Sequence, residues 1–266
     1  MTRGIIDFHT HAFPDEIAGR AMKNLEEEGD IKAQLDGTST SLLSSMDACG
    51  IEKSIVCSIA TKPSQFLSIL TWCKKINSER ILPFPSFHPE DTHFAERIHQ
   101  IKQEGFKGIK FHPYYQDFNL DDESMFPVYE KICEANLIIV VHTGFDMAFP
   151  RIEKADPAKI VIVKTMFPDI KLVTTHLGSW EQWTEVEKLL VGKPIHMEIS
   201  FSLESLEKER ARSIILNHPK EYILFGTDSP WTDQKKTLLL LQKLDLGEEM
   251  ERLILRENAA NLLLSV

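Results

Sequence analysis

The sequence alternates from end to end between short β-rich runs and amphipathic helical segments. Eight runs have the composition of strands, at residues 4–9, 54–60, 81–87, 108–112, 137–142, 171–176, 195–200 and 222–227. Helix start signals lie between the runs; Asp156 followed by Pro157, for example, predicts a capped helix. Eight strand–helix units in 266 residues predict an α/β fold of the (β/α)8 barrel type.

A doubly wound open sheet is the competing architecture. It is disfavoured because no glycine-rich phosphate-binding fingerprint follows the first run. The polar ends of the runs recur about every 31 residues, which is the length of one βα unit. The chain contains no linker and no low-complexity segment, so we expect a single domain over residues 1–266.

The interval between the first and second strand ends is far longer than the others. It contains a charged helical pattern over residues 15–28 and a polar stretch over residues 37–41. We interpret residues 13–41 as an insertion over the mouth of the barrel. A lid and an ordinary surface loop are both compatible with this pattern.

The charge balance excludes some classes of partner. Thirty Lys and Arg residues against forty Asp and Glu give a net charge of −10, which disfavours nucleic acid and anionic membrane surfaces. No apolar run approaches the ~20 residues that span a bilayer, and the N-terminus does not resemble a signal peptide. The four cysteines lack a metal-type spacing. We therefore expect a cytoplasmic protein with reduced thiols and a small-molecule substrate.

Histidine and aspartate side chains gather at the predicted strand ends. His9 and His11 are two residues apart on one strand, so they face the same side. His142, His176 and Asp228 lie at the ends of three other strands, and barrel active sites are built at the C-terminal strand ends. Each residue alone is a weak signal, but together they predict a metal site. Imidazole and carboxylate suit Zn²⁺ first, with Mn²⁺ or Fe²⁺ as alternatives.

At these motifs the chain resembles the amidohydrolase superfamily. Within it, the chain is most similar to the branch of metal-dependent TIM-barrel hydrolases and decarboxylases related to aminocarboxymuconate-semialdehyde decarboxylase. The motifs are Ile-Asp-Phe-His-Thr-His at 6–11, Gly-Ile-Lys-Phe-His-Pro at 108–113, Val-His-Thr-Gly at 141–144, Thr-His-Leu-Gly at 175–178 and Phe-Gly-Thr-Asp-Ser-Pro at 225–230. They span essentially the whole chain, and they are specific for the superfamily but not for a substrate.

The resemblance implies a role for each of these residues. His9, His11, His142 and Asp228 would hold one divalent ion, which lowers the pKa of a water molecule toward ~7. His176 would polarise that water or the substrate, and Asp228 would also accept the proton of the water.

Lys110 leaves two readings open. Two-metal members of the superfamily carry a carbamylated lysine on the fourth strand, whereas the decarboxylase-type members work with one ion. We favour one ion and an uncarbamylated Lys110 that acts in catalysis by contacting the substrate. His112 shares the inward face of that strand and is expected to bind substrate. His88 and Glu198 are candidates for outer support of the site.

The leading functional hypothesis is a metal-dependent hydrolase of a small cyclic amide, lactone or ester. The alternative is non-oxidative decarboxylation of an unsaturated or aromatic carboxylic acid on the same scaffold. A TatD-like nuclease is disfavoured by Lys110, which stands where that family uses a glutamate, and a non-catalytic barrel is disfavoured by the retained Asp228. Barrels of this type are often dimers, so a homodimer is one expectation, although the sequence shows no exposed apolar stripe that would mark an interface.

Overall fold

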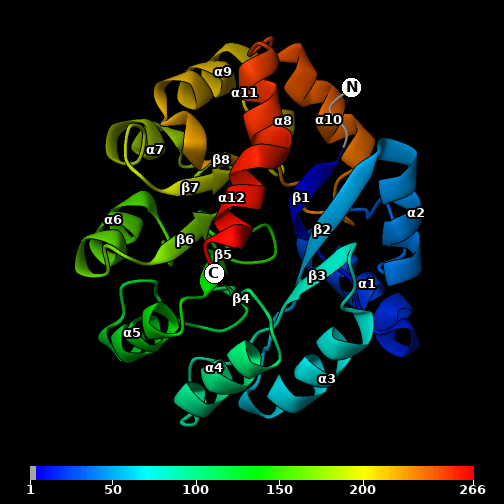
Figure 1. The fold of residues 1–266 in the computed structure, drawn as a ribbon, viewed down its shortest axis with the longest axis vertical. Helices are drawn as coiled ribbons and strands as arrows, with labels where there is room; N and C mark the ends of the chain where they lie inside the picture. The colour runs from blue at the N-terminus through cyan, green and yellow to red at the C-terminus, as the bar shows by residue number, and fades with distance from the viewer. Residues whose placement is uncertain (1–3) are drawn as a thin grey trace.

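The computed structural model describes residues 4–266 and contains the predicted (β/α)8 barrel (Figure 1). Its strands are β1 (Ile5–Thr10), β2 (Ile51–Cys57), β3 (Ile81–Phe84), β4 (Gly108–Phe111), β5 (Ile138–Val141), β6 (Lys171–Thr174), β7 (His196–Glu198) and β8 (Ile223–Leu224). All eight predicted strands are present, and β2 to β8 end slightly earlier than predicted. For β6 the backbone explains this difference, because His176 has a φ value of 58°, a left-handed conformation that cannot continue a strand.

The strands are parallel and follow chain order around the barrel. Continuous ladders join β1 to β3 and β4 to β8. Backbone hydrogen bonds also bridge the two remaining seams, several between β8 and β1 and one between β3 and β4. The Phe8 amide donates to the Phe225 carbonyl at 2.8 Å, and the Lys110 amide donates to the Pro85 carbonyl at 3.0 Å. The eight strands therefore bring their C-terminal ends to one rim.

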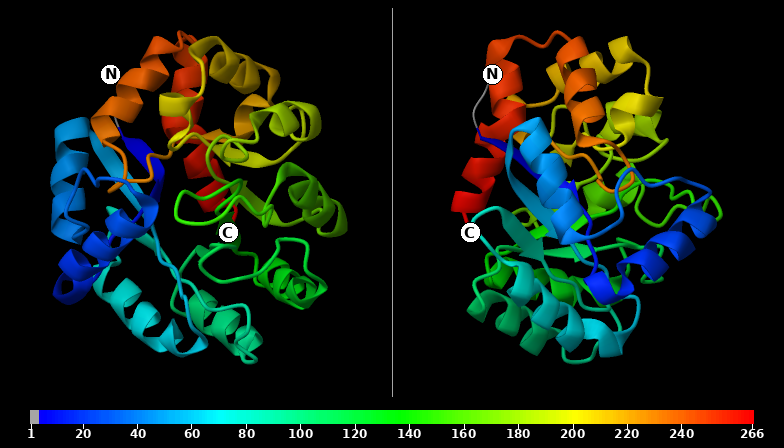
Figure 2. Two further views of the ribbon diagram at one scale, coloured as in Figure 1. Left: turned by 180° about the vertical axis from the view of Figure 1, so that it is seen from behind. Right: turned by 90° about the vertical axis from the view of Figure 1, so that its right-hand side faces the viewer.

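The helices surround the strands (Figure 2, left). They are α1 (Asp15–Gly29), α2 (Ser39–Cys49), α3 (Phe66–Ile76), α4 (Phe94–Gln103), α5 (Phe126–Glu134), α6 (Pro157–Met166), α7 (Trp183–Leu189), α8 (Ser202–Ser205), α9 (Lys208–Asn217), α10 (Gln234–Lys243), α11 (Glu248–Arg252) and α12 (Asn258–Leu264), with short 3-10 turns at Pro63–Gln65, Glu123–Met125 and Lys220–Tyr222 and a π-helical segment at Leu253–Glu257. Asp156 caps α6 as predicted, because its side chain accepts from the amides of Ala158 and Lys159. No helix in the described part of the chain is both long and apolar enough to cross a membrane.

Two hydrophobic cores hold the barrel together. The larger one lies between strands and helices and includes Ile109 and Phe111. The smaller one fills the barrel interior, where Phe8 and Phe84 pack with Leu262 of α12. In Figure 1 α12 crosses the end of the barrel that faces the viewer, so apolar packing closes the N-terminal end.

Helix α1 lies at the opposite end of the molecule. In Figure 2 (right) α1 stands out from the barrel at the right edge, whereas α12 lies along the left edge. The segment 13–41 comprises α1, a connecting stretch and the start of α2. It is tied back to itself by a 2.8 Å bond from the Phe13 amide to the Gly37 carbonyl. Helix α1 is thus placed at the rim where the strand ends converge.

Candidate active site

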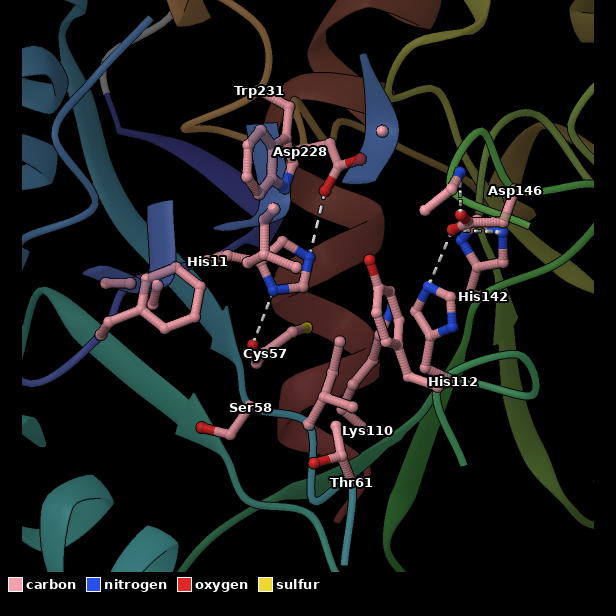
Figure 3. Close-up of a pocket in the computed structure, with 18 of the residues that line it drawn as sticks. His11, Cys57, Ser58, Thr61, Lys110, His112, His142, Asp146, Asp228 and Trp231 are labelled. Carbon is pink, nitrogen blue, oxygen red and sulfur yellow. Dashed lines mark hydrogen bonds and ion pairs between the residues drawn. The ribbon is translucent and has the colours of Figure 1, made fainter. Parts of the chain in front are cut away.

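A cavity of about 450 Å³ opens at the C-terminal rim (Figure 3). Its base is formed by side chains from or just after five strands, namely His9, His11, Lys110, His112, His142, His176 and Asp228. These are all the residues that the sequence predicts as metal ligands, catalytic residues or substrate contacts. The barrel therefore brings them to one cavity, although residues 9 and 228 are at opposite ends of the chain.

Three of the four predicted metal ligands form one tight cluster. The Nε2 atoms of His9 and His11 lie 3.1 Å apart. Asp228 Oδ1 lies 3.1 Å from His11 Nε2 and 3.4 Å from His9 Nε2. Ligand atoms from His9, His11 and Asp228 thus converge on a common point.

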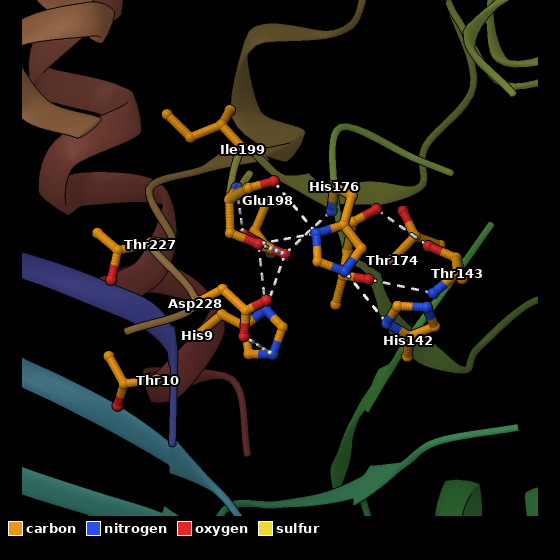
Figure 4. Close-up of polar contacts among 12 residues, drawn as sticks. His9, Thr10, His142, Thr143, Thr174, His176, Glu198, Ile199, Thr227 and Asp228 are labelled. Carbon is orange, nitrogen blue, oxygen red and sulfur yellow. Dashed lines mark hydrogen bonds and ion pairs between the residues drawn. The ribbon is translucent and has the colours of Figure 1, made fainter. Parts of the chain in front are cut away.

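Outer partners fix which atoms of the two imidazoles face this point. His11 Nδ1 lies 2.8 Å from the carbonyl of Cys57, which can only accept, so His11 carries its proton on Nδ1. His9 Nδ1 lies 3.0 Å from Glu198 Oε1 and 3.2 Å from the Ser200 hydroxyl (Figure 4). When Glu198 is ionised, His9 also carries its proton on Nδ1. Both Nε2 atoms then direct lone pairs at the cluster, an arrangement typical of metal-binding histidines.

The cluster fits a divalent cation. Asp228 Oδ1 is buried and has no hydrogen-bond partner among residues 4–266, which is costly unless positive charge is supplied. Lys110 Nζ lies 3.2 Å from His9 Nε2 and can satisfy that one lone pair. The lone pair of His11 and the Asp228 carboxylate still face each other. Nitrogen and oxygen ligands in this arrangement are suited to Zn²⁺, Mn²⁺ or Fe²⁺.

His142 belongs to a second cluster, with His112 and Asp146. The His112 ring stacks on the His142 ring at 4.1 Å, and His112 Nε2 lies 3.3 Å from Asp146 Oδ2. His142 Nε2 donates to the Phe145 carbonyl at 3.0 Å, which leaves Nδ1 unprotonated and 3.1 Å from His176 Nε2. His142 therefore faces His176 rather than completing the cluster of the other three predicted ligands.

Burial keeps the histidines in their neutral form. It lowers the pKa of His9 and His142 well below the usual histidine value, and that of His176 to about 4. Neutral imidazole is the form that binds a metal ion. Burial raises the pKa of Glu198 to about 8, against the hydrogen bonds it receives from Ser200. A cation at the cluster would favour the ionised carboxylate.

The other predicted residues differ in their placement. Lys110 is fully buried on β4, and its ammonium group reaches the base of the cavity. Glu198 supports His9 from behind, whereas His88 is absent from the cavity lining and contacts the Glu90 amide instead.

Two residues of the site were not predicted. Ser200 lies close to the Nδ1 atoms of both His9 and His176, at 3.2 and 3.1 Å. Asp146 contacts His112 from the loop after β5. Asp146 follows His142 by four residues, so a search for carboxylates in the loops beyond the strand ends could have found it.

Comparison with known proteins identifies the family. The sequence matches the amidohydrolase family over residues 6–264. The chain belongs to this family. The predicted resemblance is therefore confirmed, while a search of curated proteins finds no match.

Solved structures share the barrel of this amidohydrolase over nearly its whole length. An uncharacterized TIM-barrel protein from Bordetella bronchiseptica is 18% identical, with a TM-score of 0.77 and coverage of 98% of this chain and 99% of that chain. A 5-carboxyvanillate decarboxylase from Novosphingobium aromaticivorans, with bound manganese, is 14% identical, with a TM-score of 0.71 and coverage of 98% and 97%. A probable 2-pyrone-4,6-dicarboxylic acid hydrolase from Acinetobacter baumannii is 14% identical, with a TM-score of 0.67 and coverage of 99% of both chains. At these identities the likeness establishes the fold.

Proposed function

We propose that this amidohydrolase is a metal-dependent decarboxylase of a small aromatic or unsaturated carboxylic acid. The distribution of charge in the cavity carries the proposal. The cluster of His9, His11 and Asp228, which we call the ligand cluster, lies at its base with Lys110. Apolar side chains such as Trp180 and Trp231 line its walls. With a divalent ion bound beside Lys110, the base would attract a carboxylate, and apolar surroundings favour a step that converts a charged carboxylate into neutral CO2.

The sequence favours hydrolysis as the leading hypothesis and decarboxylation as the alternative. The solved structures support decarboxylation over hydrolysis. Decarboxylases of 5-carboxyvanillate and of 2,6-dihydroxybenzoate share the fold, beside one probable pyrone hydrolase. Each of these enzymes is described by its acid substrate. A small carboxylate is therefore the substrate class that we propose.

The residues at the base of the cavity would have separate roles in the reaction. His9, His11 and Asp228 would hold a divalent ion, which supplies positive charge that stabilises the negative charge of the bound acid. Lys110 would pair with an oxygen of the substrate. When the bond to the carboxylate breaks, its electron pair stays on the substrate carbon and CO2 leaves. Asp228 would relay the proton that this carbon then takes up.

The neutral histidines would orient the substrate. His176 is anchored through Nδ1 by the Ser200 carbonyl at 3.2 Å, and its Nε2 faces His142. His112 lines the cavity beside His142. Both histidines can exchange hydrogen bonds with polar groups of the substrate without adding charge to the site.

The product decides between the two reactions. Protein loaded with Mn²⁺ or Zn²⁺ is incubated with 2,6-dihydroxybenzoate, 5-carboxyvanillate and other aromatic acids, and with 2-pyrone-4,6-dicarboxylate, in ¹⁸O-labelled water. We expect CO2 in a 1:1 ratio with an aromatic product. Ring opening of the pyrone with ¹⁸O in the product, and no CO2 from any acid, would show a hydrolase instead.

Hydrolysis is the second candidate because the probable pyrone hydrolase shares the fold. Among residues 4–266, however, Lys110 is the only Lys or Arg side chain that lines the cavity. A dicarboxylic acid would bring a second negative charge for which the lining offers no second basic side chain. The lining therefore supports a substrate with one carboxylate, such as 2,6-dihydroxybenzoate, over 2-pyrone-4,6-dicarboxylate and 5-carboxyvanillate, which carry two each.

A further inference from the structure

The cavity is larger than a single aromatic ring requires. Its volume is about 450 Å³, whereas an apolar cavity of about 150 Å³ is large enough to hold benzene. The ligand cluster and Lys110 lie at one end of it. The other end reaches the outer helices α1 and α3, whose side chains line the same continuous cavity.

Helix α1 presents an apolar stripe to this outer end. Ile17, Ala21 and Leu25 are spaced four residues apart, so they lie on one face of the helix. Ala18 and Met22, which are buried against the rest of the protein, continue the same apolar face, and Ile17 lies at its edge. The remainder of α1 is rich in charged residues. Ile17 is 39% exposed, so the protein itself leaves the stripe partly uncovered.

Helix α3 supplies an apolar wall of its own. Ile69 and Trp72 are three residues apart and both line the cavity. The outer arm of the cavity is thus bounded by aliphatic side chains from α1 and by Ile69 and Trp72 from α3. Polar side chains at this wall come from the start of α3, where Gln65 and Ser68 carry no charge.

We propose that the substrate carries an apolar chain or second ring that lies between α1 and α3 while its single carboxylate lies at the base of the cavity. This inference rests on the proposed function, which places the carboxylate at the ligand cluster. The continuity of the apolar arm with that cluster identifies the occupant as part of the substrate. The stripe on α1 then has a partner. Lys110 is the one lysine or arginine that residues 4–266 contribute to the lining, which matches a tail without charge.

Binding of unreactive benzoates tests this arrangement without relying on turnover. Isothermal titration calorimetry on the Mn²⁺-loaded protein compares benzoate, 4-butylbenzoate and terephthalate. The para substituent points directly away from the carboxylate and so toward the outer arm. Each buried methylene tightens binding about four-fold. We expect 4-butylbenzoate to bind at least about tenfold more tightly than benzoate, with a ceiling of about 200-fold for full burial, and terephthalate to bind more weakly than benzoate.

Two variants of α1 locate the tail. Ala21→Asp places a charge on the apolar stripe and should abolish the advantage of 4-butylbenzoate while benzoate binds as in the wild type. Asn24→Asp places the same charge at an exposed position of the same helix and should leave the advantage intact. Benzoate binding also reports that each variant is folded. Ile69→Ala, on the opposite wall, should reduce the advantage several-fold.

The outcomes separate this inference from the proposed function. Equal binding of benzoate and 4-butylbenzoate, or a butyl advantage that survives Ala21→Asp, overturns the placement of a tail and leaves the decarboxylase proposal standing. Tighter binding of terephthalate overturns the requirement for an uncharged tail. Failure of every benzoate to bind overturns the carboxylate site, and the proposed function and this inference fall together.

Discussion

The hydrogen bonds of Glu198 make Glu198→Gln the most informative single change at the site. Its Oε1 lies 3.0 Å from His9 Nδ1, 2.7 Å from the Ser200 hydroxyl and 3.1 Å from the His176 amide. Its Oε2 accepts from the Ser200 amide at 2.7 Å. A glutamine replaces one of these oxygens by an NH2 group, which then faces a donor in either orientation. The substitution also removes the negative charge that holds the proton of His9 on Nδ1.

The loss should appear in metal affinity. Removing an outer partner of a metal-binding histidine typically weakens binding 10- to 100-fold, which corresponds to roughly 1.4–2.7 kcal/mol. Competition titrations with a chelating indicator, using Zn²⁺ and Mn²⁺, measure the dissociation constant directly. The matched control is Glu209→Gln, which makes the same chemical change at an exposed position at the start of α9 and should leave the affinity unchanged.

A folded Glu198→Gln protein whose metal affinity stays within twofold of the wild type would refute the reasoning. It would mean that His9 is not a ligand, or that its orientation does not depend on Glu198. Circular dichroism and the unfolding midpoint in the presence of chelator establish that the variant is folded. The comparison is therefore independent of any assay of turnover.

Three further predictions concern the same cluster. Gly226→Ala should weaken metal binding as Glu198→Gln does, because a Cβ at this position would lie 2.1 Å from Glu198 Oε2; unchanged affinity in titrations would contradict this. Asp228→Asn should keep the fold and abolish turnover, and an enzyme that retains wild-type rates of product formation would remove Asp228 from catalysis. Chelation should lower the thermal midpoint, and metal added at a hundredfold excess over its dissociation constant should restore about 2.7 kcal/mol, or ~5–10 °C in a differential scanning experiment; an identical midpoint with and without metal would argue against the site.

The fold could be predicted because the alternation of strand-like and helix-like segments extends along the whole chain. Eight apolar runs alternating with helical patterns leave few architectures, and the motif residues at their ends fix the direction of each strand. The ends themselves were placed too late for β2 to β8. Periodicity does not report backbone conformation, and after β6 the left-handed φ of His176 and Leu177 turns the chain out of the ladder just where His176 lines the cavity.

Only the site residues at or near the ends of strands could be predicted from the sequence. His9, His11 and Asp228 converge because β1 and β8 are neighbours in a closed barrel, which follows from the eightfold pattern. Ser200 and Asp146 belong to loops after β7 and β5, and loop geometry is not encoded in strand periodicity. The orientation of His142 depends on the Phe145 carbonyl in the same loop, so its separation from the first three ligands had no sequence signal.

This separation bears on how many ions the site holds. The carboxylate of the second cluster has partners within the protein, because Asp146 accepts from the Ala148 amide at 2.9 Å and lies 3.3 Å from His112 Nε2, although His112 Nδ1 has none among residues 4–266. The carboxylate of the first cluster is less well satisfied, since Asp228 Oδ1 has no hydrogen-bond partner among the same residues. A cation is therefore needed at one cluster and would disrupt existing bonds at the other. We expect elemental analysis to find close to one ion per chain, insensitive to added bicarbonate, whereas two ions and bicarbonate activation would indicate that Lys110 is carbamylated and bridges both clusters.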